Sequence, residues 1–296
     1  MKFSLVVATK NRVNEVDRFL RALERQSYSD FEVIIVDQNS DNRLVNVVNC
    51  YSHIFPITHI QKASSGASRA RNQGRLLAKG DIIAYPDDDC LYPPDVLAKV
   101  AHFFKTNSTW DGLTVRVIDL ESDRDAFDYC LQKSGKIDYF TAWSLGIGPS
   151  MFFRAHLAKK IAFDEEMGPG ATWVGGEDTD YLLRCLDCDA VVYYDFELFV
   201  RHPRPYAIYK IRQLAWREFT YGRGFGYLMR KRNISLSIVL HQLVEPTILL
   251  GKYMVTGKLR YALPCPGMGL GRVLGYWEGV QKLPRGNCHE SEICSN

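Results

Sequence analysis

Short apolar runs alternate with helix-like patterns in the first part of the chain. The runs fall at residues 3–8, 31–36, 57–60 and 81–85, and each has the length of a buried strand. Between and after them, apolar residues recur at every third or fourth position, which predicts helices over 13–26, 43–51, 64–79 and 93–105. Such alternation is typical of an α/β protein whose mostly parallel sheet is covered by helices on both faces.

The pattern becomes less regular after residue 105. Strands are predicted over 110–118, 148–154 and 190–194, with a polar loop or short helix over 121–136. A glycine-rich loop over 168–176 leads into a helix that opens at Glu177. A long basic helix is predicted over 206–231. Two glycine groups are expected to be flexible turns, the first of them breaking this helix: Gly222, Gly224 and Gly226, then Gly267, Gly269 and Gly271.

The composition is that of an ordinary globular protein. Hydrophobic residues make up 46% of the 296 positions, enough for one large domain with an appendage or for two small domains. The net charge of +3 does not support nucleic-acid binding, although residues 201–232 carry nine Lys or Arg residues against one acid, Glu218. The eight cysteines are scattered and no signal peptide is recognised, so we expect free thiols in a reducing compartment. Residues 234–250 are too polar for a transmembrane helix and are expected in the core or lying on the surface.

Three consecutive acids, Asp87, Asp88 and Asp89, end the apolar run over 81–85. Ligands of open α/β sheets bind at the carboxyl ends of the strands, which is where these acids would lie. Adjacent carboxylates repel one another unless a cation lies between them, and oxygen ligands suit Mg²⁺ or Mn²⁺. The alternative is a solvated acidic turn.

Other polar residues follow predicted strands or open helices. Asp37 could accept hydrogen bonds from a base or ribose, or could be an acid at a helix start. Arg69 and Arg71 could contact a base or diphosphate, or could form a solvated helix face. No dinucleotide fingerprint and no P-loop follows the first strand.

A second acidic site, Glu177 and Asp178, opens a helix directly after the glycine-rich loop. An acid there is favoured by the helix dipole alone, but a tight loop that presents an acid pair is also a plausible site for a general base. His202, at a strand end, is either a further metal ligand or a histidine satisfied within the core.

Five segments occur in an order and at spacings that resemble one known family. They are VVATKNR at 6–12, VD at 36–37, GASRARNQG at 66–74, DDD at 87–89 and GED at 176–178. Together they resemble the family 2 glycosyltransferases of GT-A fold, over about residues 1–205. The resemblance implies a mostly parallel, mixed sheet in a nucleotide-sugar-binding and catalytic domain over 1–205. Residues 206–296 would form a helical, basic C-terminal region.

The same resemblance assigns roles to individual residues. A nucleoside pocket would be lined by Thr9, Asn11 and Asp37, with Arg71 on the base. Asp89 would be the most direct ligand of Mg²⁺ or Mn²⁺, with Asp87 or Asp88 nearer the ribose and His202 as a less regular metal ligand. Asp178 would be the catalytic base, with Glu177 as the alternative.

The function implied is metal-dependent, inverting transfer of a sugar from a nucleoside-diphosphate donor to a hydroxyl of a saccharide or lipid-linked saccharide, in cell-surface polysaccharide synthesis. Residues 206–232 interleave basic and aromatic side chains, which suits peripheral contact with the inner face of the plasma membrane or a helix that closes the acceptor side. The alternatives are a nucleotidyltransferase, which would need a glycine-rich loop after the first strand, and a non-catalytic sugar-nucleotide-binding module.

Overall fold

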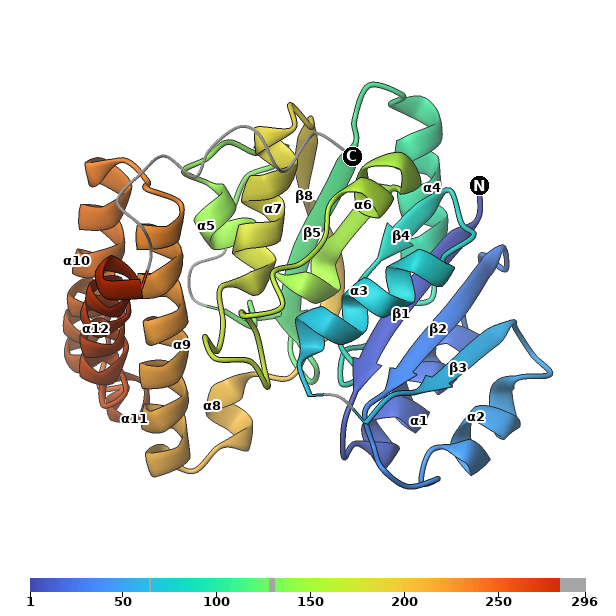
Figure 1. The fold of residues 1–296 in the computed structure, drawn as a ribbon, viewed down its shortest axis with the longest axis horizontal. Coiled ribbons are helices and arrows are strands. Elements are labelled where there is room, and N and C mark those ends of the chain that lie inside the picture. Colours follow the sequence, from blue (N-terminus) through green and yellow to red (C-terminus); the bar gives the residue numbers. More distant parts are fainter. Residues whose placement is uncertain (64, 128–130, 283–296) are drawn as a thin grey trace.

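The computed structural model describes residues 1–63, 65–127 and 131–282, and eight strands in these ranges form one mixed sheet (Figure 1). The strand order is β3-β2-β1-β4-β7-β5-β8-β6. Pairing is parallel from β3 to β4, whereas β7 is antiparallel to both of its neighbours. The strands are β1 (Phe3–Thr9), β2 (Phe31–Asp37), β3 (Ile57–Gln61), β4 (Ile82–Ala84), β5 (Gly112–Asp119), β6 (Gly135–Lys136), β7 (Met151–Arg154) and β8 (Val192–His202). The predicted α/β class with a mostly parallel, mixed sheet is confirmed.

Helices cover both faces of this sheet because its central strands are apolar on both sides. In β1, Phe3, Leu5 and Val7 pack into one core cluster, and Val6 packs into the other. The first cluster lies under α1 (Val13–Glu24), α2 (Val45–Tyr51) and α4 (Val96–Thr106). The second lies under α3 (Ala67–Leu77), α5 (Ala142–Leu145), α6 (Ala155–Lys160) and α7 (Glu177–Asp187).

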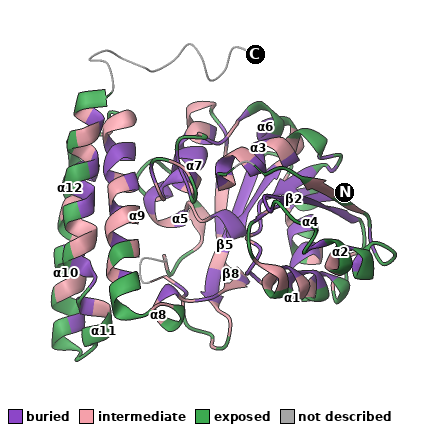
Figure 2. Cartoon of the chain, turned by 60° about the horizontal axis from the view of Figure 1, so that its bottom comes forward, coloured by how far each residue is buried: buried purple, intermediate pink, exposed green. Residues whose placement is uncertain are grey.

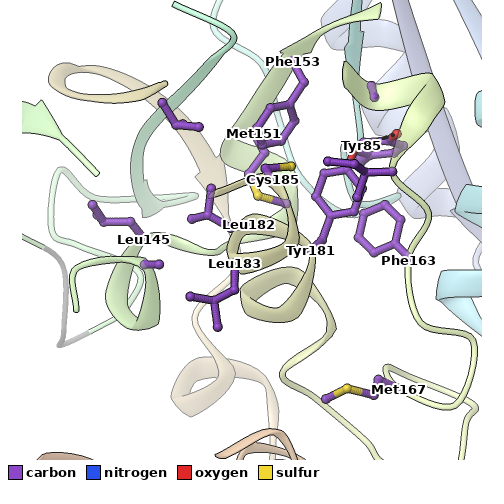
Figure 3. Close-up of a cluster of buried hydrophobic side chains, with 14 of the residues drawn as sticks. Tyr85, Leu145, Met151, Phe153, Phe163, Met167, Tyr181, Leu182, Leu183 and Cys185 are labelled. Atoms are coloured by element: carbon purple, nitrogen blue, oxygen red, sulfur yellow. Dashed lines mark hydrogen bonds between the residues drawn. The ribbon is translucent and has the colours of Figure 1, made fainter. Parts of the chain in front are cut away.

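An aromatic group anchors the two acidic segments to the second cluster (Figure 3). Tyr85 lies two residues before the acid triplet, and Tyr181 begins the second turn of α7. Their rings meet edge to face at 5.5 Å between centroids, and Phe163 stacks on Tyr181 at 4.2 Å. Burial of each large side chain is worth about 1.5–3 kcal/mol, so this packing holds both acidic segments at fixed positions.

Five helices follow β8 and lie side by side at one end of the sheet (Figures 1 and 2). Within the described ranges they are α8 (Pro205–Ile208), α9 (Ile211–Lys231), α10 (Leu236–Val255), α11 (Leu259–Ala262) and α12 (Cys265–Lys282). None of the helices among the described residues is long and apolar enough to cross a membrane.

The two predicted glycine turns were wrong, because both groups lie inside continuous helices, α9 and α12. The glycines instead allow these helices to touch backbone to backbone. A Cβ atom at Gly226 would overlap the carbonyl oxygen of Arg272, and one at Gly275 would overlap that of Arg223. We call this contact the glycine seam; its members are Gly222, Gly226, Gly271 and Gly275.

The other predicted elements are present with shifted ends. β8 is longer than the predicted 190–194, and the predicted strand 148–154 begins with a 3₁₀ turn over Gly148–Ser150. The helices α5 and α6 were not predicted. Ser64 of the predicted helix 64–79, residues 128–130 of the predicted loop and residues 283–296 lie outside the described residues.

Candidate active site

The carboxyl ends of β1, β2 and β4 bring the predicted polar residues to one edge of the sheet. Thr9 and Asp37 are the last residues of β1 and β2 and are paired in the sheet register. The triplet from Asp87 follows β4, the neighbour of β1 on its other side. The three strand ends therefore meet at one edge of the sheet.

Asp37 is fully buried and forms the centre of a polar group at this edge. One of its oxygens accepts hydrogen bonds from the backbone and side-chain nitrogens of Asn39, at 2.9 and 2.7 Å, and the other lies 3.1 Å from Nε2 of His59. The backbone nitrogen of Asn11, a residue with a positive φ of 62°, donates to Oδ1 of Asn39 at 2.8 Å. Asn11 and Asp37 were both expected in the nucleoside pocket. They are linked through Asn39, a residue that was not among the predicted site residues.

Asp87, Asp89 and His202 converge at the end of β4, although His202 lies 113 positions after Asp89 in the sequence. Nε2 of His202 lies 3.5 Å from Oδ2 of Asp87 and 3.4 Å from Oδ1 of Asp89. One ligand atom from each residue lies within 4.8 Å of the other two, a spacing that fits a bound cation. The two carboxylates suit Mn²⁺ or Mg²⁺ and the imidazole suits a transition metal, so the residues present fit the expected metal, Mn²⁺ in particular.

Each of the two clustered carboxylates uses its second oxygen to accept from an arginine. Oδ1 of Asp87 accepts from Arg71 at 2.8 Å, and Oδ2 of Asp89 accepts from Arg12. Arg12 also donates to Oδ1 of Asp88 at 3.0 Å. The arginines therefore hold both carboxylates so that one oxygen of each faces His202.

Burial and the arginines give the three acids different proton affinities. Burial alone would raise the pKa of Asp87, but the contact with His202 and the charge of Arg71 outweigh it and lower that pKa to about 2. For Asp88 burial prevails over the charge of Arg12, and the pKa rises to about 7. Burial would lower the pKa of His202, yet its contacts with Asp87 and Asp89 raise it. The clustered carboxylate of Asp87 is thus held ionised.

Asp178, at the start of α7, is joined to this cluster through Arg71. The chain enters the helix through Gly175 and Gly176, with φ of 85° and 82°, a conformation that favours glycine. Oδ1 of Asp178 accepts from Arg71 at 2.8 Å, and Oδ2 accepts from the backbone nitrogen of Gly148 at 2.8 Å. Its orientation is therefore fixed from two sides.

The neighbouring Glu177 is buried more deeply than Asp178. Only 7% of its side chain is exposed, against 18% for Asp178, and its carboxylate lies 3.7 Å from Arg71. Burial, followed by repulsion from Asp178, raises the pKa of Glu177 to about 8, whereas burial of Asp178 raises its pKa despite the charge of Arg71. Asp178 is the more accessible of the two carboxylates.

A cavity of about 460 Å³ joins these groups to the C-terminal helices. On one side it is lined by the acid triplet, Asp178 and His202. On the other it is lined by side chains of α9, α10 and α12, among them Glu218, Tyr221, Phe225, Glu245, Tyr253 and Arg272. A molecule bound beside the acids would therefore also meet the helical region.

The sequence did not indicate three contacts of this site. Arg12 was part of a polar loop, and nothing in its spacing shows that it reaches Asp89. Arg71 was expected on a nucleoside base, whereas its guanidinium joins Asp87 to Asp178. The hydrogen bond from the backbone nitrogen of Gly148 to Asp178 involves a peptide group, which every residue except proline carries, so the sequence gives no indication of it.

A family model described as glycosyl transferase family 2 matches residues 4–161, more than half of the chain. The chain belongs to this family. The resemblance carried by the five sequence segments is therefore confirmed.

Curated relatives match this chain over part of their length. An uncharacterized glycosyltransferase of Haemophilus influenzae is 40% identical over 105 residues, which cover 35% of each chain. TarS of Staphylococcus aureus, a poly(ribitol-phosphate) beta-N-acetylglucosaminyltransferase, is 27% identical over 107 residues, which cover 35% of this chain and 19% of its own. The matches thus span about a third of the first relative and less of the second.

Solved structures show that the fold is GT-A. The mannosyltransferase PcManGT from Pyrobaculum calidifontis, in complex with GDP-Man and Mn²⁺, superposes with a TM-score of 0.68 at 16% identity, covering 94% of this chain and 87% of its own. S. aureus TarS 1-349 in complex with UDP-GlcNAc gives 0.60 at 15% identity, covering 94% and 92%.

Proposed function

We propose that this glycosyltransferase moves a sugar, with inversion and with the help of a divalent cation, from a nucleoside-diphosphate donor to a hydroxyl of a saccharide or lipid-linked saccharide. The observation that carries the proposal is one arginine, Arg71, bonded both to Asp87 of the carboxylate–histidine cluster and to Asp178. A cation site and a base that line one cavity are what displacement of a diphosphate by a hydroxyl requires.

Asp87, Asp89 and His202 would hold the cation, Mn²⁺ or Mg²⁺. When bound, it would neutralise the negative charge of the leaving diphosphate. PcManGT binds GDP-Man with Mn²⁺ and TarS binds UDP-GlcNAc, which supports a nucleotide sugar as the donor here. Thr9, Asn11 and Asp37 would line the nucleoside side, and Asp87 or Asp88 would lie nearer the ribose.

Asp178 would act as the general base. Its oxygens accept one hydrogen bond each from Arg71 and Gly148, and each carboxylate oxygen retains a further lone pair for the acceptor hydroxyl. The hydroxyl oxygen would attack the anomeric carbon while its proton passes to Asp178 and the bond from that carbon to the diphosphate oxygen breaks. Attack opposite the leaving group inverts the anomeric configuration. Glu177, more buried, is the alternative base.

Neither alternative function is supported. The loop after β1, which runs from Thr9 to Arg12, contains no glycine, whereas a nucleotidyltransferase would need a glycine-rich loop there. A non-catalytic module would be expected to have lost its base, and Asp178 is held in place by two hydrogen bonds.

Thermal unfolding with UDP, GDP and dTDP, each with and without Mn²⁺, tests the donor site. One nucleotide at about 100 times its dissociation constant should stabilise the enzyme by about 2.7 kcal/mol, and only with the cation. The matched nucleoside without its diphosphate serves as the control. Equal stabilisation with and without Mn²⁺ would contradict the proposed role of the cation.

A further inference from the structure

The outward face of α10 and α12 is apolar and has no partner among the described residues. Along α10 this face presents large side chains that are between 50% and 89% exposed: Leu236, Leu240, Val244, Ile248 and Val255. On α12 it presents Leu270, Val273, Leu274 and Trp277, between 37% and 60% exposed. We call these nine residues the apolar face; Figure 2 shows the exposed positions in green along both helices. Monomeric proteins rarely expose such contiguous patches without a partner.

The border of the apolar face is basic. Exposed cations lie from the last turn of α10 into α11, namely Lys252, Lys258 and Arg260. Lys210 and Arg212 are exposed at the start of α9. These two ends are adjacent, because Arg260 donates to the backbone oxygen of Tyr209 at 2.7 Å. The face thus ends in a group of cations.

A basic cavity of about 790 Å³ opens at the same end. It is lined by five cationic residues and one acid: Arg116, Arg124, Arg204, Lys252 and Lys258, with Asp125. Nε of Arg204 is buried and has no hydrogen-bond partner among the described residues. The cavity is therefore suited to an anionic group such as a phosphate.

The whole helical region, residues 201–282, carries a net positive charge. Residues 201–282 contain fourteen Lys or Arg residues and three acids. Each acid is paired with an arginine: Glu218 with Arg217, Glu245 with Arg272, and Glu278 with Arg223. Two copies brought together through this region would therefore repel each other.

We propose that the apolar face and the basic cavity dock the enzyme on an anionic lipid bilayer. The apolar side chains would enter the interface, Trp277 at its polar boundary, and the lysines of the cavity would meet the phosphates of the headgroups. Protein–protein interfaces normally contain about one hydrogen bond per 100–200 Å². The apolar face offers few hydrogen-bonding groups, which favours a lipid over a protein as its partner.

This docking surface differs from the one expected from the sequence. Residues 206–232 were expected either to contact the membrane or to close the acceptor side. In the structure α9 packs against α12 through the glycine seam and against the catalytic part, where Gly224 lies beside the backbone of Val174. The docking proposal rests on the proposed function in one respect. An acceptor linked to a lipid lies in the bilayer, so an enzyme docked on the bilayer would be placed next to it.

Co-sedimentation of the full chain with vesicles tests the proposal. Vesicles of phosphatidylcholine are compared with vesicles containing about one third phosphatidylglycerol, at low and high salt. The wild type should bind the anionic vesicles, and less so as salt rises. The double variant Ile248→Glu/Trp277→Glu should lower the partition coefficient at least about tenfold, because two apolar side chains no longer enter the interface. Lys252→Gln/Lys258→Gln should lower it about tenfold at low salt only.

Leu76→Glu is the matched control, because Leu76 is 71% exposed and lies on α3, away from α10 and α12. It should bind vesicles as the wild type does. Mn²⁺-dependent hydrolysis of the donor without vesicles should be equal in all variants, which separates a failure of docking from a failure of the proposed function. Binding that survives the Ile248/Trp277 change, a wild type that stays free at low salt, or a dimer that the same change dissociates would each overturn the proposal.

Discussion

Arg71 donates a hydrogen bond of 2.8 Å to Asp178, a residue 107 positions later in the chain. A second nitrogen of the same guanidinium donates to Asp87. The proposed base and the proposed cation site are therefore connected through one rigid planar group. A planar fork can span two carboxylates, and a single ammonium cannot.

Arg71→Lys should reduce transfer by about 100-fold, because Asp87 and Asp178 would no longer be held at a fixed separation. Initial rates at saturating donor measure the effect. Arg69→Lys is the control on the same helix, since Arg69 is 43% exposed and pairs with Glu165. Equal rates for the two variants would show that Arg71 only neutralises charge.

Asp89→Asn should abolish transfer and leave the fold intact, because it removes one of the three groups expected to hold the cation. In the wild type, EDTA should remove activity and added Mn²⁺ should restore it. Asp95→Asn, at an exposed acid paired with Lys99, should behave as the wild type. Full transfer in EDTA would rule out the cation.

Asp178→Asn should stop transfer while donor affinity stays nearly unchanged, because the base acts on the acceptor. Donor binding by calorimetry and transfer by product formation give the two quantities separately. Glu177→Gln should retain measurable transfer. If instead Glu177→Gln is inactive and Asp178→Asn is active, the roles of the two acids are exchanged.

Asp180→Asn should destabilise the fold by about 2 kcal/mol at pH 7. Burial alone would raise the pKa of Asp180, but Lys231 of α9 and Arg184 outweigh it and lower the pKa. A carboxylate whose folded pKa lies below its unfolded value of about 3.9 stabilises the fold above that pH, and this contribution is lost as pH falls through the folded pKa.

The difference between wild type and Asp180→Asn should therefore shrink below about pH 4. Denaturant unfolding at several pH values measures it. Asp17→Asn, which breaks an exposed pair with Arg21, should cost at most about 0.5 kcal/mol. A constant difference between wild type and Asp180→Asn from pH 7 to pH 3 would contradict this ionic contribution.

Gly275→Ala should destabilise the enzyme, because the new methyl group would overlap the backbone oxygen of Arg223 and separate α12 from α9. Gly251→Ala is the converse control. Gly251 lies in α10 with open space around it, so alanine there should stabilise the helix by about 0.5–1 kcal/mol. Thermal unfolding should give a lower midpoint temperature for Gly275→Ala and a higher one for Gly251→Ala than for the wild type. Shifts in these opposite directions would establish that α9 and α12 need the close contact at the seam.

The glycines also show where sequence reasoning fails. Gly222 and Gly226 have low helix propensity, about 1 kcal/mol below alanine, so their pattern was interpreted as a turn. The close approach of α12 offsets that cost, and no local pattern encodes a partner some 50 residues away.

By contrast, the strands and the acid triplet could be predicted. A buried parallel strand is a continuous apolar run, and its carboxyl end must lie at the ligand-binding edge, which placed Asp37 and Asp87 correctly at that edge. Arg12 could not be predicted, because its partners Asp88 and Asp89 meet it only after the sheet has formed.

The glycine seam also restricts how the length of α9 can vary. Gly222 and Gly226 face α12 together only because four residues make slightly more than one helical turn. An insertion of one residue between them would rotate the rest of α9 by about 100° and turn a side chain, instead of a bare Cα, towards Arg272. Family members that retain the seam should therefore differ in length at the connections between these helices, such as around Gly257, and keep a fixed number of residues between the two glycines.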